Sequence, residues 1–418
     1  MTAQETPRKD QPKTRDARSA ASLQTLLVPA LAVFTGLVIG GIVIAVTDPA
    51  TNEAFGNFFQ APGAAFAAAW KAVSVAYGAL FEGSFGNPGN MVDAIRVYFS
   101  TGETDLLLKA FYPFTESLVT ATPYIFAGLA VAIGFRAGLF NIGAEGQFYI
   151  GALGAAYVGY SIDGLPWFIH LPLALLGGAA AGAFWGAIPG YLKAKFGAHE
   201  VVNTIMMNWI AFRLSDWLLT GPMQASGFRP VTPNVETAAE LPHIFPDPLR
   251  FNWGFFLALA VAGLVYWFLF KTTRGFEIRA VGANPNAAKY AGMSIVTNIV
   301  LVMTISGALA GLSGTAQVLG VDHWVGQGFS AGYGFDSIAI ALLGKSHPGG
   351  VVLAALLFGF LRGGATRMQS MAGIPIDIIS IIQGLVIVFV AAPDIIRWLY
   401  RIRLPKTDEA VLTRGWSR

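Results

Sequence analysis

The stretch of sequence that decides the fold runs from residue 113 to residue 160 and reads PFTESLVTATPYIFAGLAVAIGFRAGLFNIGAEGQFYIGALGAAYVGY. It holds two long apolar runs, at about 113–135 and 140–160, with a short segment between them that contains glycine and polar residues. A run of roughly 20 apolar residues is long enough for a helix to cross the hydrocarbon core of a bilayer. The stretch therefore predicts two membrane-spanning helices joined by a short connection.

The rest of the chain has the composition of a protein that lies in a membrane. Of its 418 residues, 54% are hydrophobic and only 12% are charged, about half the charged share of a soluble domain. We therefore predict an all-α polytopic membrane protein with about ten membrane-spanning helices. The expected spans lie at about 23–46, 113–135, 140–160, 171–192, 200–220, 253–270, 296–319, 334–344, 348–366 and 376–393.

Two segments leave the number of spans open between about nine and eleven. The run 334–344 is too short to cross a core of about 30 Å alone, so we expect one limb of a broken or re-entrant element. Residues 64–81 could form a further helix. Lys71 and the following Glu82 favour a position on the outer surface or against the bundle over an eleventh span.

The basic residues indicate the orientation of the spans. Most Lys and Arg residues fall in tails and loops that share one side when the N-terminus faces inward. Because such residues collect on the cytoplasmic side, both termini are expected to be cytoplasmic. The basic residues assigned to the outer side are Lys71, Arg96, Lys109, Arg229, Arg250, Arg362 and Arg367. The formal net charge of +3 is then mostly a topology signal, and we expect no nucleic-acid partner.

The chain divides into a transmembrane domain at 23–395 and two tails. Residues 1–22 are polar and of mixed charge, which predicts a disordered cytoplasmic tail, and residues 396–418 form a basic cytoplasmic tail. Within the domain, the longer connections are the outer segments 48–112 and 221–252 and the inner loop 271–295.

Several kinds of chemistry are excluded by the residues present. The chain has no Cys and only five scattered His, so we expect no disulfide, no metal site and no cofactor. The sequence Gly344-Lys345-Ser346 resembles the end of a phosphate-binding loop, but Ala339 stands where that motif requires glycine. We therefore expect no ATP site on this chain. No convergent acid, base or metal group points to a catalytic residue or a membrane enzyme.

Polar side chains inside spans are costly, so each indicates either a pathway or a packing contact. Asn141 and Glu145 share a helical face, whereas Gln147 points elsewhere, so the three cannot form one cluster on an unbroken helix. Arg213 and Asp216, three residues apart, are expected to neutralise each other. The candidate path residues are Asn141, Glu145, Gln147, Phe148, Asn203, Asn208, Trp209, Gln317 and Asp336.

Glycines suggest where the helices are interrupted. Gly138, Gly143 and Gly146 favour an unwound helix start, although they could also serve only to let helices approach closely. Residues 326–350 mix glycines with one Asp and a short apolar run. One broken segment in each half of a chain is typical of a translocation route between structural repeats.

The inner loop 271–295 has the features of a docking element. Asn284 before Pro285 predicts a helix start, and Gly292 a stop, so we expect a short helix at 285–291. Small residues at 287, 288 and 291 would let a partner protein sit close. The candidate coupling residues are Arg274, Gly275, Arg279, Gly282, Asn284, Ala287, Ala288, Tyr290 and Gly292.

This loop resembles the coupling loop of ABC-importer permeases of the branched-chain amino acid and simple-sugar type. Residues 76–86, AYGALFEGSFG, residues 135–147, FRAGLFNIGAEGQ, and residues 200–208, EVVNTIMMN, look like the nucleoside-uptake branch of that superfamily. The resemblance covers about 70–395.

The resemblance implies a pore subunit in a bacterial cytoplasmic membrane, surrounded by lipid and moving a small molecule. Its implied partners are a cytoplasmic ABC ATPase, a second permease, identical or homologous, and an extracytoplasmic substrate-binding lipoprotein. Simple sugars and branched-chain amino acids remain alternative cargoes. An ion-coupled secondary transporter that uses Glu145 and Asp336 remains an alternative mechanism.

Overall fold

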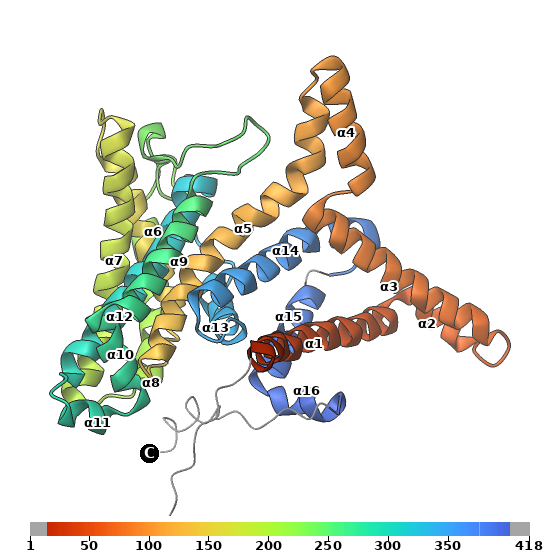
Figure 1. Cartoon of the computed structure of the whole chain (residues 1–418). Coiled ribbons are helices and arrows are strands. Elements are labelled where there is room, and N and C mark those ends of the chain that lie inside the picture. The colour runs from red at the N-terminus through yellow and green to blue at the C-terminus, as the bar shows by residue number, and fades with distance from the viewer. Residues whose placement is uncertain (1–14, 376, 402–418) are drawn as a thin grey trace, which may run out of the picture.

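The structure, a computed structural model, describes residues 15–375 and 377–401 (Figure 1). Its longer helices are α1 (Arg15–Thr47), α3 (Pro62–Phe85), α4 (Pro88–Thr101), α5 (Asp105–Arg136), α6 (Ala144–Ser161), α7 (Trp167–Phe196), α8 (Glu200–Leu219), α9 (Gly254–Lys271), α12 (Ile295–Gln317), α14 (Pro348–Ala372) and α15 (Asp377–Ala391). The shorter ones are α2 (Pro49–Gly56), η1 (Thr237–Ala239), α10 (Thr273–Ala283), α11 (Pro285–Tyr290), the π-helical turn η2 (Val318–Asp322), α13 (Tyr333–Leu343) and α16 (Pro393–Leu399).

The predicted all-α class is confirmed. Strand pairing in the described ranges is limited to isolated β-bridges between loops. Seven helical segments there are long and apolar enough to cross a membrane, and they lie at Leu27–Thr47, Pro62–Thr101, Asp105–Arg136, Trp167–Phe196, Gly254–Lys271, Ile295–Asp322 and Pro348–Ala372. By length and hydropathy, the described residues therefore contain fewer candidate membrane spans than the ten or so that we expected.

The expected spans 140–160 and 200–220 form helices α6 and α8 but are absent from those seven. Their polar content explains the difference, because α6 opens with Glu145 and Gln147 and α8 carries both Arg213 and Asp216. The runs 334–344 and 376–393 form the short apolar helices α13 and α15.

Helix α3 contains the segment that was expected to lie on the surface or against the bundle. It packs against the bundle, because Ala76, Ala79 and Leu80 share a core cluster with Leu361 and other residues of α14. With α4 it also satisfies the length and hydropathy of a span. At the N-terminus, α1 already begins at Arg15, while residues 1–14 and 402–418 of the expected tails lie outside the described residues.

Helix α5 forms the centre of the molecule. Its residues from Tyr124 to Ile133 are fully or almost fully buried, and they pack against α12, α13 and α14 in the largest core cluster. Helices α6 to α12 lie on one side of α5, and α1, α3, α15 and α16 lie on the other (Figure 1). Helix α13, too short to cross alone, lies between α5 and α14.

Helices α7 and α12 are in backbone contact along a row of glycines. A Cβ atom on Gly182 would lie 2.7 Å from the Cα of Gly311, and one on Gly186 would lie 2.8 Å from the Cα of Gly307. Small residues allow this close approach in membrane proteins, where helix association relies on packing. These glycines recur every four residues. This spacing is a sign of close helix packing that was not among the predictions from the sequence.

The Pro-rich segment 221–252 is ordered against η2 and the residues that follow it. The amides of Thr232, Val235 and Leu241 donate to the carbonyls of Val325, His323 and Leu319 at 2.9, 2.9 and 2.7 Å. Arg250 pairs with Glu116 of α5. Burial alone would lower the pKa of Arg250, but the hydrogen bond and charge of Glu116 outweigh burial and raise it.

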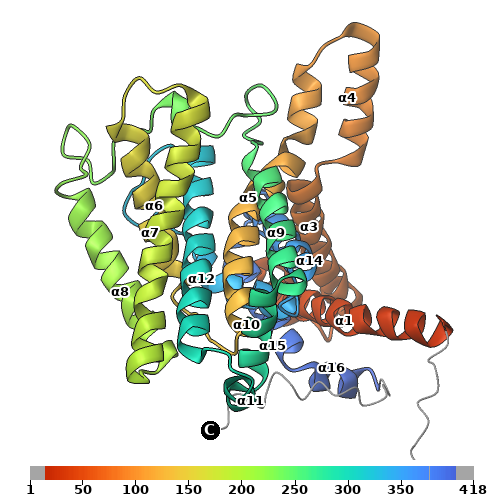
Figure 2. The same ribbon diagram turned by 60° about the vertical axis from the view of Figure 1, so that its left-hand side comes forward.

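The two ends of the bundle carry different elements. Helix α4 and the segment 221–252 lie at one end, and α10 and α11 lie at the opposite end (Figure 2). Part of the segment 48–112, helix α4, and the segment 221–252 thus lie opposite the loop 271–295, whereas α2 and α3 of the segment 48–112 do not lie at that end.

Candidate functional site

The chain is unwound between α5 and α6, as the glycines predict. Helix α5 ends at Arg136 and α6 begins at Ala144, with Gly138 at a φ of +69° between them. We call residues 137–143 the first broken segment. The residues between η2 and α13, 323–332, form the second broken segment and include Gly328 and Gly332 at φ values of +68° and +87°.

The first broken segment is held by buried amide side chains. Asn141 Nδ2 donates to Gln147 Oε1 at 2.9 Å and to Ser306 Oγ of α12 at 2.8 Å, and Asn141 Oδ1 accepts from the Gly143 amide at 2.9 Å. The side chain of Asn141 is fully buried. Asn141 and Gln147, which could not meet on an unbroken helix, meet because the chain is unwound.

Asn208 of α8 holds the same region from the other side. Its Oδ1 accepts from the Gly146 amide at 2.8 Å, and its Nδ2 donates to the Ile142 carbonyl at 3.0 Å. Asn203 lies on a different face of α8 and takes no part, and its buried Nδ2 has no partner among the described residues. Only one of the two asparagines therefore faces the broken segment.

Glu145, in the first turn of α6 directly after the first broken segment, contacts the second broken segment and the start of α13. Its carboxylate accepts hydrogen bonds from the Ser330 hydroxyl, from the Gly334 amide at 2.7 Å and from the Phe335 amide at 3.2 Å. Those amides belong to the first turn of α13, where unpaired N–H groups and the helix dipole favour a negative charge. Gly334 is required here because a Cβ atom would overlap the backbone of Glu145.

Asp336 of α13, two residues after Gly334, lies in a second polar cluster. Its Oδ2 accepts from the Tyr124 hydroxyl at 2.7 Å and lies 3.4 Å from Nη1 of Arg362. Arg362 also donates to Tyr124 Oη at 2.6 Å and to the Ala331 carbonyl at 2.7 Å. Arg362, assigned to the outer side from the sequence, lies within the candidate span α14, where the carboxylate of Asp336 balances its charge.

The candidate aromatic residues lie in different surroundings. Phe148 is fully buried, and its ring stacks on Tyr333 with centroids 5.7 Å apart. Trp209 is 57% exposed and contacts Phe212. Gln317, at the end of α12, donates to Asp322 at 2.9 Å.

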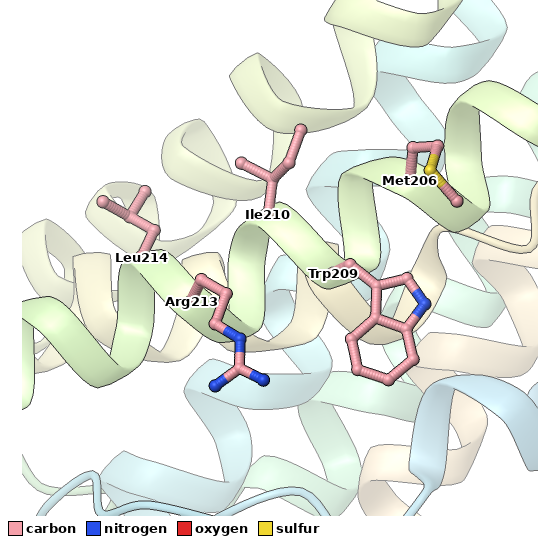
Figure 3. Close-up of a pocket in the computed structure, with 5 residues that line it drawn as sticks. All are labelled: Met206, Trp209, Ile210, Arg213 and Leu214. Atoms are coloured by element: carbon pink, nitrogen blue, oxygen red, sulfur yellow. The ribbon is translucent and has the colours of Figure 1, made fainter.

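The outward face of α8 forms an open groove lined by Met206, Trp209, Ile210, Arg213 and Leu214 (Figure 3). Trp209 and Arg213 point to the same side of the helix in Figure 3. The expected pair is confirmed, with Arg213 Nη1 3.5 Å from an Asp216 oxygen, yet the Arg213 side chain remains 78% exposed. A largely exposed Arg thus lies on an otherwise apolar helix face.

The inner loop contains two helices where one was expected. The short helix at 285–291 is confirmed as α11, and Asn284 Oδ1 accepts from the Ala287 amide at 3.1 Å, as expected of a cap. Gly292 follows at a φ of +81°. The preceding helix α10 was missed, because its sequence TRGFEIRAVGA has no continuous apolar face.

The expectation that Ala288 faces a partner is wrong. Ala288 is only 3% exposed and turns inward, whereas Tyr290 on the same helix is 96% exposed. A two-turn helix is too short for its sequence to show which face is buried. The exposed surface of α11 is instead formed by residues that include Ala287 and Tyr290.

Helix α10 touches the first broken segment. A Cβ atom on Gly138 would lie 3.1 Å from the carbonyl oxygen of Gly282, so the two backbones are in direct contact. Arg279 anchors α10 to α9, since its Nε donates to the Leu269 carbonyl at 3.0 Å. Gly275 packs on the carbonyls of α9, and Arg274 pairs with Glu277 at 3.0 Å.

Comparison with known proteins identifies the family. Residues 114–391 match the family described as branched-chain amino acid transport system / permease component. The chain belongs to this permease family. The resemblance predicted from its motifs is confirmed, and no solved structure matches the chain.

Three relatives of the permease are named for guanosine, nucleosides and glucose. It is 39% identical to the guanosine ABC transporter permease protein NupP of Bacillus subtilis (strain 168), over 90% of this chain and 96% of the relative. It is 34% identical to the nucleoside ABC transporter permease protein NupB of Lactococcus lactis subsp. cremoris, over 72% and 85%. It is also 38% identical to the glucose ABC transporter permease protein TsgB13 of Haloferax volcanii, over 74% and 83%.

The contacts of Glu145 lead to a prediction about the permease. Replacing Glu145 with Ala leaves the Gly334 and Phe335 amides and the Ser330 hydroxyl without their acceptor. We expect this to lower the free energy of unfolding by about 1–3 kcal/mol, and Glu145→Gln to cost less because its amide oxygen still accepts. Denaturant unfolding in detergent measures both.

The matched control is Glu103→Ala, because Glu103 is an exposed acid in the loop before α5. It should leave stability unchanged within about 0.5 kcal/mol. Equal stability of the Glu145→Ala and Glu103→Ala proteins would show that the carboxylate does not hold α13.

Proposed function

We propose that the chain is the membrane permease subunit of an ABC importer for nucleosides. The observation that carries this proposal is the 39% identity to a guanosine permease over nearly the whole of both chains. The geometry supports a coupled transporter, because the inner helix α10 is in backbone contact with the first broken segment. A movement of α10 would reach the polar centre of the bundle through that contact.

The energy source is ATP hydrolysis on a partner chain. In this permease Gly344-Lys345-Ser346 forms the turn between α13 and α14, and Arg136 donates to the Ser346 carbonyl at 2.9 Å. This turn is a helix connection rather than a phosphate-binding loop. Exposed residues of α11, with Tyr290 foremost, form the docking surface for the ATPase.

The proposed topology places α10, α11 and both termini in the cytoplasm of a bacterial cell. Two observations support it: the distribution of Lys and Arg, and the location of α10–α11 and the segment 221–252 at opposite ends of the bundle. The ordered segment 221–252 then faces outward, where an extracytoplasmic binding protein delivers cargo.

The polar residues divide into two proposed roles. The first role is to brace the broken helices, and it belongs to four almost fully buried residues that form hydrogen bonds in and around the broken segments: Asn141, Glu145, Gln147 and Asn208. The partly exposed Asp336 contributes to the path itself. Of the remaining candidates, the buried Phe148 supports the path from behind, Gln317 bonds Asp322 directly before the second broken segment, and Asn203 and Trp209 make no hydrogen bond to either broken segment among the described residues.

A second permease covers the groove on α8. An exposed Arg on an apolar membrane helix is costly in contact with lipid tails, so Arg213 needs a protein or aqueous surface opposite it. A homologous permease supplies both, since cargo would pass between the two chains. Glucose is the second candidate cargo, because the relative from Haloferax volcanii is named as a glucose permease.

The cargo is tested in proteoliposomes that contain the permease, its ATPase, its second permease and its binding protein. Excess unlabelled inosine, adenosine or uridine should reduce uptake of labelled nucleoside at least tenfold, because each carries the shared ribose, and uptake should require ATP. Glucose, ribose and leucine should not compete. ATP-dependent uptake of glucose or leucine without nucleoside competition would contradict the nucleoside assignment and leave the importer intact.

Docking of the ATPase is tested by Ala287→Trp, which adds bulk to the exposed side of α11. We expect transport and co-purification of the ATPase to fall about tenfold or more, equivalent to about 1.4 kcal/mol, with membrane insertion unchanged. Ala61→Trp, at an exposed site before α3 in the outer segment, is the control. Full docking in the Ala287→Trp protein would disprove this contact.

The groove on α8 is tested with a photo-crosslinker on a single Cys, since the chain contains none. A probe at Met206→Cys should form a covalent adduct with the second permease, because Met206 lines the groove. The same probe at Leu264→Cys, equally apolar and exposed on α9, is expected to label mainly lipid. Equal labelling of the second permease from both positions argues against the proposed interface.

A further inference from the structure

The cluster of Tyr124, Asp336 and Arg362 differs from the other ion pairs of the permease in its location. It joins three helices, because Tyr124 belongs to α5, Asp336 to α13 and Arg362 to α14. The Tyr124 hydroxyl donates to Asp336 and accepts from Arg362, so the three side chains form one continuous hydrogen-bonded chain. The guanidinium also lies 5.2 Å from the ring centre of Tyr333.

The cluster has unused hydrogen-bonding capacity. The hydrogen bonds of the cluster use Asp336 Oδ2 and Arg362 Nη1 and Nη2. Within residues 15–375 and 377–401, Asp336 Oδ1 accepts no hydrogen bond and Arg362 Nε donates none. The two side chains are 30% and 31% exposed. One acceptor and at least one donor thus remain on partly accessible groups.

The location of the cluster distinguishes it from a charge pair that only holds helices together. Arg367 and Glu82 form such a pair further along α14, at 2.9 Å. Arg367 Nε likewise has no hydrogen-bond partner among the described residues, and the pair joins α14 to α3 without any link to a broken segment. Arg362 instead also holds Ala331 of the second broken segment.

We infer that Asp336 and Arg362 bind neighbouring hydroxyl groups of the cargo. A hydroxyl is both a donor and an acceptor, so one hydroxyl of a vicinal diol can donate to Asp336 Oδ1 while the next accepts from Arg362. Hydrogen bonds to charged groups are the stronger ones, and a neutral diol leaves the charge of the pair balanced. Ribose in a nucleoside and a free sugar share this chemistry, and a branched-chain amino acid lacks it.

The inference deepens the proposed function and rests on it. The test compares the maximal transport rates of inosine and 2′,3′-dideoxyinosine in the reconstituted complex. The variant is Asp336→Asn with Arg362→Gln, which removes both charges together and leaves no unpaired charge. The binding protein is the same in every reaction, so its own preference cancels when the rate ratios of variant and unmodified permease are compared.

We expect the preference for inosine to fall about tenfold in the double variant, with transport of dideoxyinosine nearly unchanged. Tyr124→Phe is the second variant, which keeps the ring and removes the hydroxyl that orients Asp336, and it should shift the ratio in the same direction. The control is Glu82→Gln with Arg367→Gln, which should leave the ratio as it is.

Equal loss of both rates in the double variant would overturn the inference and assign the cluster a structural role. An equal shift in the control would overturn it as well. If the unmodified complex moves no nucleoside, the proposed function has failed, and the same comparison between glucose and its deoxy analogues then decides the diol contact on its own.

Discussion

The contact between the Glu145 carboxylate and the first turn of α13 is the constraint on which the rest of the molecule depends. A short helix inside a membrane bundle leaves its first amides without intrahelical partners, and lipid offers none. Glu145 supplies the acceptor, and its own burial is possible because those amides and Ser330 surround it. The start of α6 and the start of α13 therefore stabilise each other.

The same constraint links the polar centre to helix α10. A series of contacts connects α10 with α13. Gly282 of α10 contacts Gly138 of the first broken segment, this segment leads to Glu145, and Glu145 bonds to α13. Every step is a backbone contact or a buried hydrogen bond, so displacement of α10 would be transmitted with little loss. Arg136 adds a parallel route, since it bonds the turn that follows α13.

Features set by residues close in sequence could be predicted, and features set by distant pairs could not. The cap of α11 by Asn284, the pair of Arg213 with Asp216 and the unwinding near Gly138 each depend on neighbours within a few positions. The bond of Glu145 to Gly334 joins two halves of the chain. The contact of Arg362 with Asp336 could not be predicted for the same reason, because only the fold brings the two side chains together.

The glycine contact between α7 and α12 has a further consequence for how the molecule can move. Where Gly182 and Gly186 meet Gly307 and Gly311, the surface between the helices contains no side chain that could change rotamer. At this contact the two helices cannot adjust by changing rotamers, and no side-chain entropy was lost there when they came together. The pair therefore acts as a rigid plate, and any change of shape during a transport cycle must be absorbed by the unwound segments beside it.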